Sequence, residues 1–191
     1  ENWSLQLTLF YIQVRDQISG YELPATPGRT YYRNASKTQR TGLELNSSWN
    51  WSPYFGISAN YTFSHFRYAQ FLSGSNDFTG NMQPLTPKHH GNISIDWRWS
   101  EFETIQLSIG YTDAMWLNDA NTVKSSTYAE CNALIQSNRM LGKKISFGIQ
   151  ANNIFNWMTY SNFRVNAAAM RYFEAATPTT IGIFVKADIA K

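Results

Sequence analysis

The feature that most constrains the fold is a strict alternation of polar and apolar residues within 92–112. Every second side chain is apolar from Asn92 to Trp99, and the alternation resumes after a short polar stretch. The apolar positions are Ile93, Ile95, Trp97 and Trp99, then Ile105, Leu107, Ile109 and Tyr111. Because successive side chains of a strand point to opposite faces, the pattern predicts two strands with one apolar face. That face is uncharged, aliphatic in the middle and aromatic toward its ends, which suits lipid better than a second protein layer.

The composition is consistent with a β-protein in a membrane and excludes several other classes. Of the 191 residues, 15% are charged and 16% are aromatic. No apolar run approaches the roughly 18 residues that a membrane helix needs, whereas a spanning strand needs only about 9–11 residues. The net charge of +3 is scattered along the chain, so we expect no nucleic-acid partner. Cys131 is the single cysteine and is expected to act as a small apolar side chain.

The alternation recurs along the chain and predicts an all-β protein with about eight strands. The predicted strands cover residues 3–18, 31–49, 55–66, 92–99, 105–112, 128–138, 145–152 and 180–189. Short turns and long polar loops alternate between them, with long loops near 19–30, 67–87, 113–127 and 157–178. Outer-membrane barrels have short turns at one end and long loops at the other. The sequence therefore predicts an antiparallel transmembrane β-barrel.

The aromatic residues of the apolar face sort into two groups, as two membrane interfaces require. Beside the short turns lie Trp3, Trp49, Phe55, Trp97 and Trp99. Toward the long loops lie Tyr11, Tyr61, Phe63 and Tyr111. The opposite face consists mostly of Ser, Thr, Asn, Gln and Gly. Such small residues would fill a narrow eight-stranded barrel poorly, so they favour the wall of a wider barrel.

Four stretches resemble the C-terminal barrel of TonB-dependent outer-membrane receptors. They are RNASKTQRTGLELNSSWNWSPYFGISANYTFSHFRY, FTGNMQPLTPKHHGNISIDWR, FGIQANNIFNWMTY and RYFEAATPTTIGIFVK. Asn153-Ile154-Phe155 matches the family's "NLF" signature, and the resemblance runs in the right order over nearly all of the chain. One departure is the end of the chain at Ile189-Ala190-Lys191. Barrels of this family usually finish with an aromatic residue, so we expect either that final residues are missing or that the assembly signal is atypical.

The resemblance implies that residues 1–191 are about eight C-terminal strands of a 22-stranded barrel in the outer membrane. It implies uptake of a ferric siderophore or similar nutrient chelate, energised by the TonB complex through a plug domain that this sequence lacks. Outer-membrane lipid and lipopolysaccharide are further expected partners, and neither a cofactor nor enzymatic activity is expected. Two alternatives stay open: a complete eight-stranded barrel with a structural or adhesion role, and a soluble secreted binding module.

Candidate ligand contacts gather in and near the long loops, where arginine and aromatic side chains are frequent. Arginine offers a donor fork to carboxylates and phosphates, and aromatic rings stack on planar groups. Anionic ferric chelates carry both kinds of group, so we expect ligand contacts here, with a solvated loop surface as the alternative. The candidates are Arg29, Tyr31, Tyr32, Arg33, Arg40, Arg67, Trp116, Trp157, Tyr160, Arg164, Arg171 and Tyr172.

Two pairs of adjacent residues resemble a metal site and a nucleophile–base pair, but their positions in the strands exclude both. His89 and His90 are adjacent in a strand, so they point to opposite faces, and no other ligand is suitably spaced for a metal site. Ser64 and His65 are separated by the same alternation and cannot act as nucleophile and base. We therefore expect neither a metal site nor catalysis.

Overall fold

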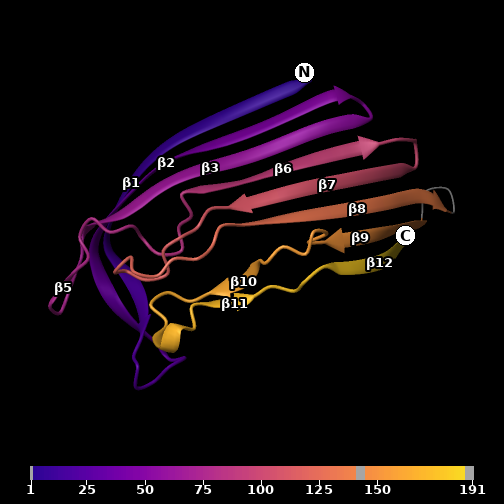
Figure 1. Ribbon diagram of the computed structural model, residues 1–191. Coiled ribbons are helices and arrows are strands. Elements are labelled where there is room, and N and C mark those ends of the chain that lie inside the picture. Colours follow the sequence, from indigo (N-terminus) through magenta and orange to yellow (C-terminus); the bar gives the residue numbers. More distant parts are fainter. Residues whose placement is uncertain (1, 141–144, 188–191) are drawn as a thin grey trace.

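The chain folds into one curved antiparallel sheet of eight strands, in the order β1-β2-β3-β6-β7-β8-β9-β12 (Figure 1). This computed structural model describes residues 2–140 and 145–187, without the side chains of 35, 36 and 138–140. The strands are β1 Trp3–Glu22, β2 Thr30–Ser52, β3 Phe55–Gln70, β6 His89–Arg98, β7 Glu103–Thr112, β8 Tyr128–Met140, β9 Ile145–Asn152 and β12 Thr180–Ala187. All eight predicted strands are present. The sheet has long connections at one end, the loop end, and short ones at the other, the turn end.

The sheet is open within the described residues. The first strand, β1, pairs only with β2, and the last, β12, pairs only with β9. Each unpaired backbone group costs several kcal/mol in hydrocarbon, so spanning sheets close without free edges. This arrangement contradicts the alternative of a complete eight-stranded barrel. It is the arrangement expected of consecutive wall strands in a larger barrel.

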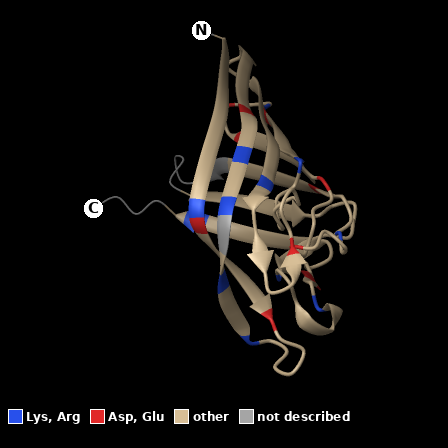
Figure 2. Ribbon diagram, turned by 90° about the vertical axis from the view of Figure 1, so that its left-hand side faces the viewer, with Lys and Arg blue, Asp and Glu red and all other residues tan. Residues whose placement is uncertain are grey.

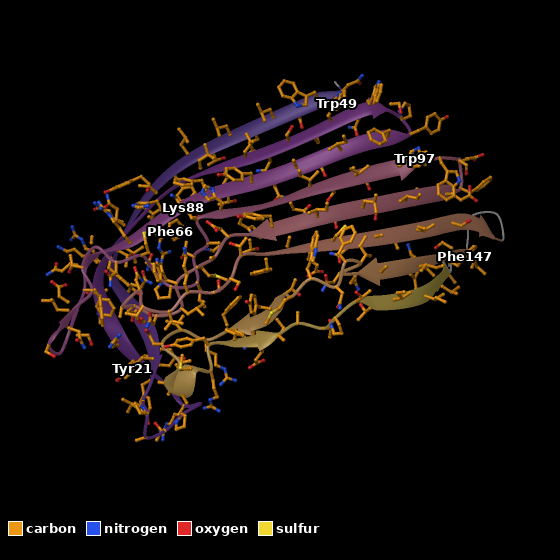
Figure 3. The ribbon with its side chains drawn as sticks, in the orientation of Figure 1. Tyr21, Trp49, Phe66, Lys88, Trp97 and Phe147 are labelled. Atoms are coloured by element: carbon orange, nitrogen blue, oxygen red, sulfur yellow. The ribbon has the colours of Figure 1, made fainter. Side chains whose placement is uncertain are left out.

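The face predicted to meet lipid, the outer face, is exposed along the whole sheet. Leu107 is 39% exposed and Ile183 is 79% exposed, and neither Ile57 nor Ile95 is buried. Figure 3 shows Trp49, Trp97 and Phe147 toward the turn end, where one predicted aromatic group lies. No second layer of the described residues covers this face. An apolar surface of this extent argues against the alternative of a soluble binding module.

The strands β1 and β2 are longer than the alternation predicts. They contain 20 and 23 residues, and the connection between them is only residues 23–29 rather than a long loop from about 19 to 30. The apolar outer face of β1 extends from Trp3 to Tyr11, which fits the about 9–11 residues of a spanning strand. The rest of β1 and β2 therefore rises beyond the bilayer at the loop end, where Figure 1 shows both strands curving away.

The extension was missed because the alternation changes phase at Asp16. Its backbone adopts a left-handed conformation, with φ of 57°. Before this residue the odd-numbered side chains of β1 lie on the outer face, whereas Gln17 and Ser19 lie on the opposite, inner face, where they contact Arg40 and Asp119. A pattern with a period of two cannot register such a shift.

The long loops contain short elements that the sequence analysis treated as loop. These are the hairpin of β4 Leu72–Ser73 with β5 Asn76–Asp77, the hairpin of β10 Tyr160–Phe163 with β11 Phe173–Ala175, and the 3₁₀ turn η2 Ala168–Met170. Among the described residues, no helix has the length and apolar character that crossing a membrane requires. Most of the short turn predicted at residues 140–143, and the chain end from Ile189 to Lys191, lie outside the described residues.

Two phenylalanines on the inner face lie directly opposite glycines of the neighbouring strand. Phe10 is paired with Gly42, and Phe184 is paired with Gly148. A Cβ atom at Gly148 would lie 2.5 Å from Cζ of Phe184 and 2.8 Å from the carbonyl oxygen of Ile135. The absence of a side chain at each glycine gives the aromatic ring its place against the sheet.

Replacing Gly148 with alanine is expected to destabilise the protein by about 1–3 kcal/mol, because the Phe184 ring and the Ile135 carbonyl must both move. Gly182→Ala is the matched control, since Gly182 lies in neighbouring β12 and has no atom within 4 Å of its Cβ position. Urea unfolding of the protein from its complete gene, in detergent micelles, measures both. An equal loss of stability in the two variants would contradict the close approach.

Candidate ligand-binding end of the barrel wall

The loop end is organised around the buried carboxylate of Asp119. Its side chain is fully buried and accepts hydrogen bonds from Arg33, Tyr68, Ser19 and Asn166. The Arg33 Nη2 atom lies 2.8 Å from Asp119 Oδ2 and forms an ion pair with it. Burial, followed by the neighbouring Asp119 charge, raises the pKa of the Tyr68 hydroxyl, which therefore stays protonated as a donor. These four donors satisfy a carboxylate that would otherwise be costly to bury.

The partners of Asp119 come from segments far apart in the chain. Ser19 lies in β1, Arg33 in β2 and Tyr68 in β3, while Asn166 lies in the loop before η2. The Asn81 side chain adds a bond from the loop after β5 to the Asp119 carbonyl oxygen, at 2.8 Å. The network thus fastens three long loops to one another and to the strands. Sequence analysis did not single out Asp119, because no local pattern distinguishes it from other polar loop residues.

Two of the candidate arginines serve this packing and lie on the inner face. Arg33 also donates to Ser73 Oγ at 2.8 Å and stacks over the Phe71 and Phe78 rings. Arg40 donates to Gln83 and Gln17, at 3.0 Å and 2.9 Å. Both guanidinium groups therefore have protein partners that hold the loops in place. A ligand that bound them would have to compete with these bonds.

Arg67 does not share the face of the other candidates. Its Nε and Nη2 atoms donate to Gln39 Oε1, at 3.1 Å and 2.8 Å, and Gln39 also donates to the hydroxyl of Tyr11 on the outer face. The neighbouring Tyr68 points inward to Asp119. Alternation therefore places Arg67 on the outside of the wall, away from the enclosed space in which a ligand would be held.

Three of the aromatic candidates lie in separate surroundings. Tyr160 packs in a cluster at the loop end, with ring centroids 4.9–5.3 Å from those of Tyr128, Phe163 and Phe173. Trp157 is 42% exposed and stacks near Phe155, while its backbone bonds to the Asn153 amide. Trp116 lies elsewhere, beneath the Lys124 ammonium group, 5.4 Å from its ring centroid.

Most of the remaining candidates lie at one corner around Glu22, at the end of β1. Tyr32 points the other way, because its neighbour Arg33 points inward to Asp119. Arg164 lies 4.0 Å from the Glu22 carboxylate and 2.9 Å from Glu174. Arg29 stacks over Tyr31, and Arg171 lies against Gly28, so their exposed guanidinium groups flank the same turn. The other two candidates are exposed Tyr32 and partly buried Tyr172, whose carbonyl accepts the Arg164 N–H. We call Arg29, Arg164 and Arg171 the cationic corner; within it, Arg164 is already paired with Glu22 and Glu174, whereas Arg29 and Arg171 are exposed.

Lowering the pH is expected to loosen the cationic corner. The backbone N–H of Gly28 lowers the pKa of Glu22, with help from the N–H of Ala168 and the charges of Arg164 and Arg171. A lowered folded-state pKa contributes stability that is present above the ordinary glutamate pKa of about 4.3 and is lost as pH falls through the folded value. Hydrogen-exchange protection around residues 23–29 should therefore decrease below about pH 4.3. In Glu22→Gln that decrease should vanish; its persistence would contradict this assignment.

The histidine and serine pairs lie as the alternation predicts. On the outer face, His89 Nδ1 lies 2.7 Å from the Tyr61 hydroxyl. On the inner face, His90 Nδ1 lies 3.0 Å from Thr112 Oγ1. Ser64 is buried on the inner face, opposite in direction to His65. No group of three metal-ligating side chains occurs among the described residues.

Comparison with known proteins places this sheet in a family. The profile of the TonB-dependent receptor-like β-barrel matches residues 1–154. The ferrioxamine receptor of Yersinia enterocolitica is 24% identical over 139 residues, which is 70% of this chain and 18% of that protein. The pesticin receptor of Yersinia pestis is 22% identical over 192 residues, which is 97% of this chain and 27% of that protein.

Solved structures share the fold over almost the whole chain. The siderophore receptor PiuA from Acinetobacter baumannii superposes with a TM-score of 0.72 and 18% identity, covering 96% of this chain and 26% of that one. The ferric yersiniabactin uptake receptor FyuA from Yersinia pestis also gives 0.72, with 19% identity, covering 96% and 27%. The chain thus spans about a fifth to a quarter of the length of the relatives that it matches. It belongs to the TonB-dependent receptor family, within the β-barrel region.

Proposed function

We propose that the protein is an outer-membrane receptor that takes up an iron chelate, with this chain as part of the barrel wall and its external loops. The observation that carries the proposal is the open eight-stranded sheet with an exposed apolar outer face. Such a face needs lipid, and such edges need further strands. The family is one of transporters rather than enzymes.

The substrate class that we propose is a ferric siderophore or a related anionic chelate. Relatives of this chain include receptors named for ferrioxamine and for ferric yersiniabactin. The cationic corner supports an anionic ligand, because guanidinium groups bind carboxylate and phenolate oxygens through charge-assisted hydrogen bonds. The Tyr160 cluster offers aromatic rings on the same end of the wall for planar chelating groups.

In the proposed receptor, transport is driven by the TonB complex through a plug domain. The wall described here contributes one side of the enclosure. Its inner face carries small polar side chains around a hollow of about 490 Å³, including Ser58, Ser94, Ser108 and Asn132. Such a surface is suited to contact a separate domain by hydrogen bonding.

The test is growth of the source bacterium under iron limitation, with and without the gene. Each strain receives a panel of ferric chelates as sole iron source, and uptake of radioactive iron is measured with and without TonB. We expect the gene to be required for one chelate, and only when TonB is present. Uptake of every chelate without the gene, or uptake independent of TonB, would contradict the proposed function.

Replacing Arg29 and Arg171 together with glutamine is expected to raise the half-saturating chelate concentration by at least about tenfold, since charged hydrogen bonds contribute about 1.5–3 kcal/mol each. Arg98→Gln is the control, because Arg98 is an exposed arginine at the turn end. Unchanged half-saturation in the double variant would place the ligand elsewhere at the loop end.

A further inference from the structure

Arg164 of the cationic corner lies between two carboxylates that differ in how firmly they are held. Its Nη1 atom lies 4.0 Å from Glu22 Oε1, and its Nη2 atom lies 2.9 Å from Glu174 Oε1. The Glu22 side chain is 5% exposed, whereas the Glu174 side chain is 53% exposed. Glu22 ends β1, and Glu174 lies in β11. Of the three arginines of the corner, Arg164 alone has ion-pair partners within the described residues.

Glu22 is a fixed part of this corner. Its Oε2 atom accepts the backbone N–H groups of Gly28 and Ala168, at 3.0 Å and 3.1 Å. These bonds join the turn between β1 and β2 to η2, and they would be lost if the carboxylate moved. The bond from Gly28 in particular lowers the pKa of Glu22, so the carboxylate is ionised at neutral pH. Glu22 therefore neutralises one guanidinium charge whether or not a ligand is bound.

Glu174 is held more loosely than Glu22. The bond from Arg164 Nη2 is the one hydrogen bond that its carboxylate accepts within the described part of the chain. Ser161 Oγ donates to the Glu174 backbone carbonyl, at 3.3 Å, and so fixes the strand rather than the side chain. An exposed ion pair contributes little to stability, because water screens it. The Glu174 carboxylate can therefore leave Arg164 when an external anion offers this guanidinium group a stronger bond.

The cationic corner and its two carboxylates together carry a small net charge. Three arginines and two glutamates leave one net positive charge. A further arginine of the candidate set, Arg33, is neutralised by Asp119. Figure 2, in which the loop end faces the viewer, shows basic and acidic segments interspersed rather than one continuous basic surface. Because Coulomb repulsion from Glu174 grows with the charge of the ligand, this carboxylate penalises a highly charged anion more than a singly charged one.

We propose that Glu174 selects ferric chelates by their charge, so that the receptor prefers a chelate with a single negative charge to one with three. The proposal rests on the proposed function, because it requires that the cationic corner binds an iron chelate. A singly charged chelate matches the net charge of the corner and binds the exposed Arg29 and Arg171, while Glu174 stays on Arg164. A triply charged chelate needs Arg164 as well, and Glu174 both occupies this arginine and repels the ligand. Glu174 is therefore a residue that determines specificity.

The test uses the purified protein from the complete gene in detergent, titrated with two hexadentate ferric chelates of different charge. One chelator has three catecholate groups, and its ferric complex carries three negative charges. The other has one catecholate and two hydroxamate groups, and its ferric complex carries a single negative charge. Quenching of tryptophan fluorescence gives the two dissociation constants at one ionic strength. We expect Glu174→Gln to tighten binding of the triply charged chelate about tenfold and of the singly charged chelate only about twofold.

Two control variants separate the charge of Glu174 from its place in the fold. Glu174→Asp keeps the charge and should keep the ratio of the two dissociation constants close to that of the unmodified protein. Asp77→Asn removes an exposed carboxylate from the hairpin of β4 and β5, in another loop. It should leave the ratio unchanged, because Asp77 has no contact with Arg164.

An unchanged ratio in Glu174→Gln would overturn the role of Glu174 alone, and so would an equal change of the ratio in Asp77→Asn. Loss of both chelates in Glu174→Gln would show that this residue supports the hairpin of β10 and β11 rather than selecting charge, which also overturns the proposal. Failure of the unmodified protein to bind either chelate would count against the proposed function, and the selection by charge would fall with it.

Discussion

Replacing Asp119 with alanine is expected to release the long loops from the wall, at a cost of about 3–5 kcal/mol. The change removes the acceptor of Arg33, Tyr68, Ser19 and Asn166 together, and it leaves the Arg33 guanidinium partly buried without its counter-ion. Hydrogen exchange should show loss of protection in residues 71–88, 113–127 and 153–179, while β6 and β7 keep theirs. These strands keep their protection because they are held by backbone pairing with their neighbours rather than by the Asp119 carboxylate.

Asp77→Ala is the matched control for that experiment. Asp77 is an exposed aspartate whose carboxylate accepts the Thr79 N–H at 2.9 Å, within one short hairpin. Its removal should change protection only near residues 72–79. If Asp119→Ala proves too damaging to purify, Asp119→Asn retains the shape and should give a smaller loss in the same loops. Loops that stay fully protected in both Asp119 variants would contradict the organising role of this carboxylate.

Replacing Ile95 with arginine is expected to cost about 2–4 kcal/mol of stability in the membrane. Ile95 lies on the outer face of β6, paired with Ile57 on one side and Leu107 on the other. An arginine there would place a charge near the middle of the apolar band. Folding into lipid vesicles under a urea gradient measures the loss.

Ser94→Arg tests the same strand on its other face. Ser94 is paired with Ser58 and Ser108 and lines the polar hollow of the inner face. An arginine at this position meets polar groups rather than hydrocarbon, so its cost should be well below that of Ile95→Arg. Equal costs for the two substitutions would contradict the assignment of the faces, and a larger cost for Ser94→Arg would reverse it.

The membrane-facing part of the fold could be predicted from the sequence because the bilayer imposes a local rule. In β6 and β7, lipid demands an apolar residue at every second position, and the residues between them face away. Each strand therefore carries its own signature, such as Ile93 and Ile95 against Ser94. The eight strands and the assignment of the outer face followed from this rule alone.

The loop end could not be predicted in the same way, because its contacts join residues that are distant in sequence. Asp119 meets Ser19 across 100 residues, and Asn166 meets the Gly20 carbonyl across 146. Only the fold brings such groups together. The candidate arginines were chosen by residue type, and type does not reveal that Arg33 is tied to Asp119 or that Arg67 lies outside the wall.

The left-handed residue at Asp16 separates two kinds of evolutionary constraint within a single strand. On the membrane side of Asp16, insertion or deletion of one residue would move each apolar side chain from the lipid-facing side to the inner side and each polar one the other way. The length of that part is therefore tightly constrained. On the loop side of Asp16, the strand needs only to reach the loops, so an inserted residue there leaves the membrane-spanning part in register with its neighbours. Relatives that recognise differently shaped cargo can thus lengthen or shorten the external portion of this ribbon without rebuilding the part that lipid surrounds.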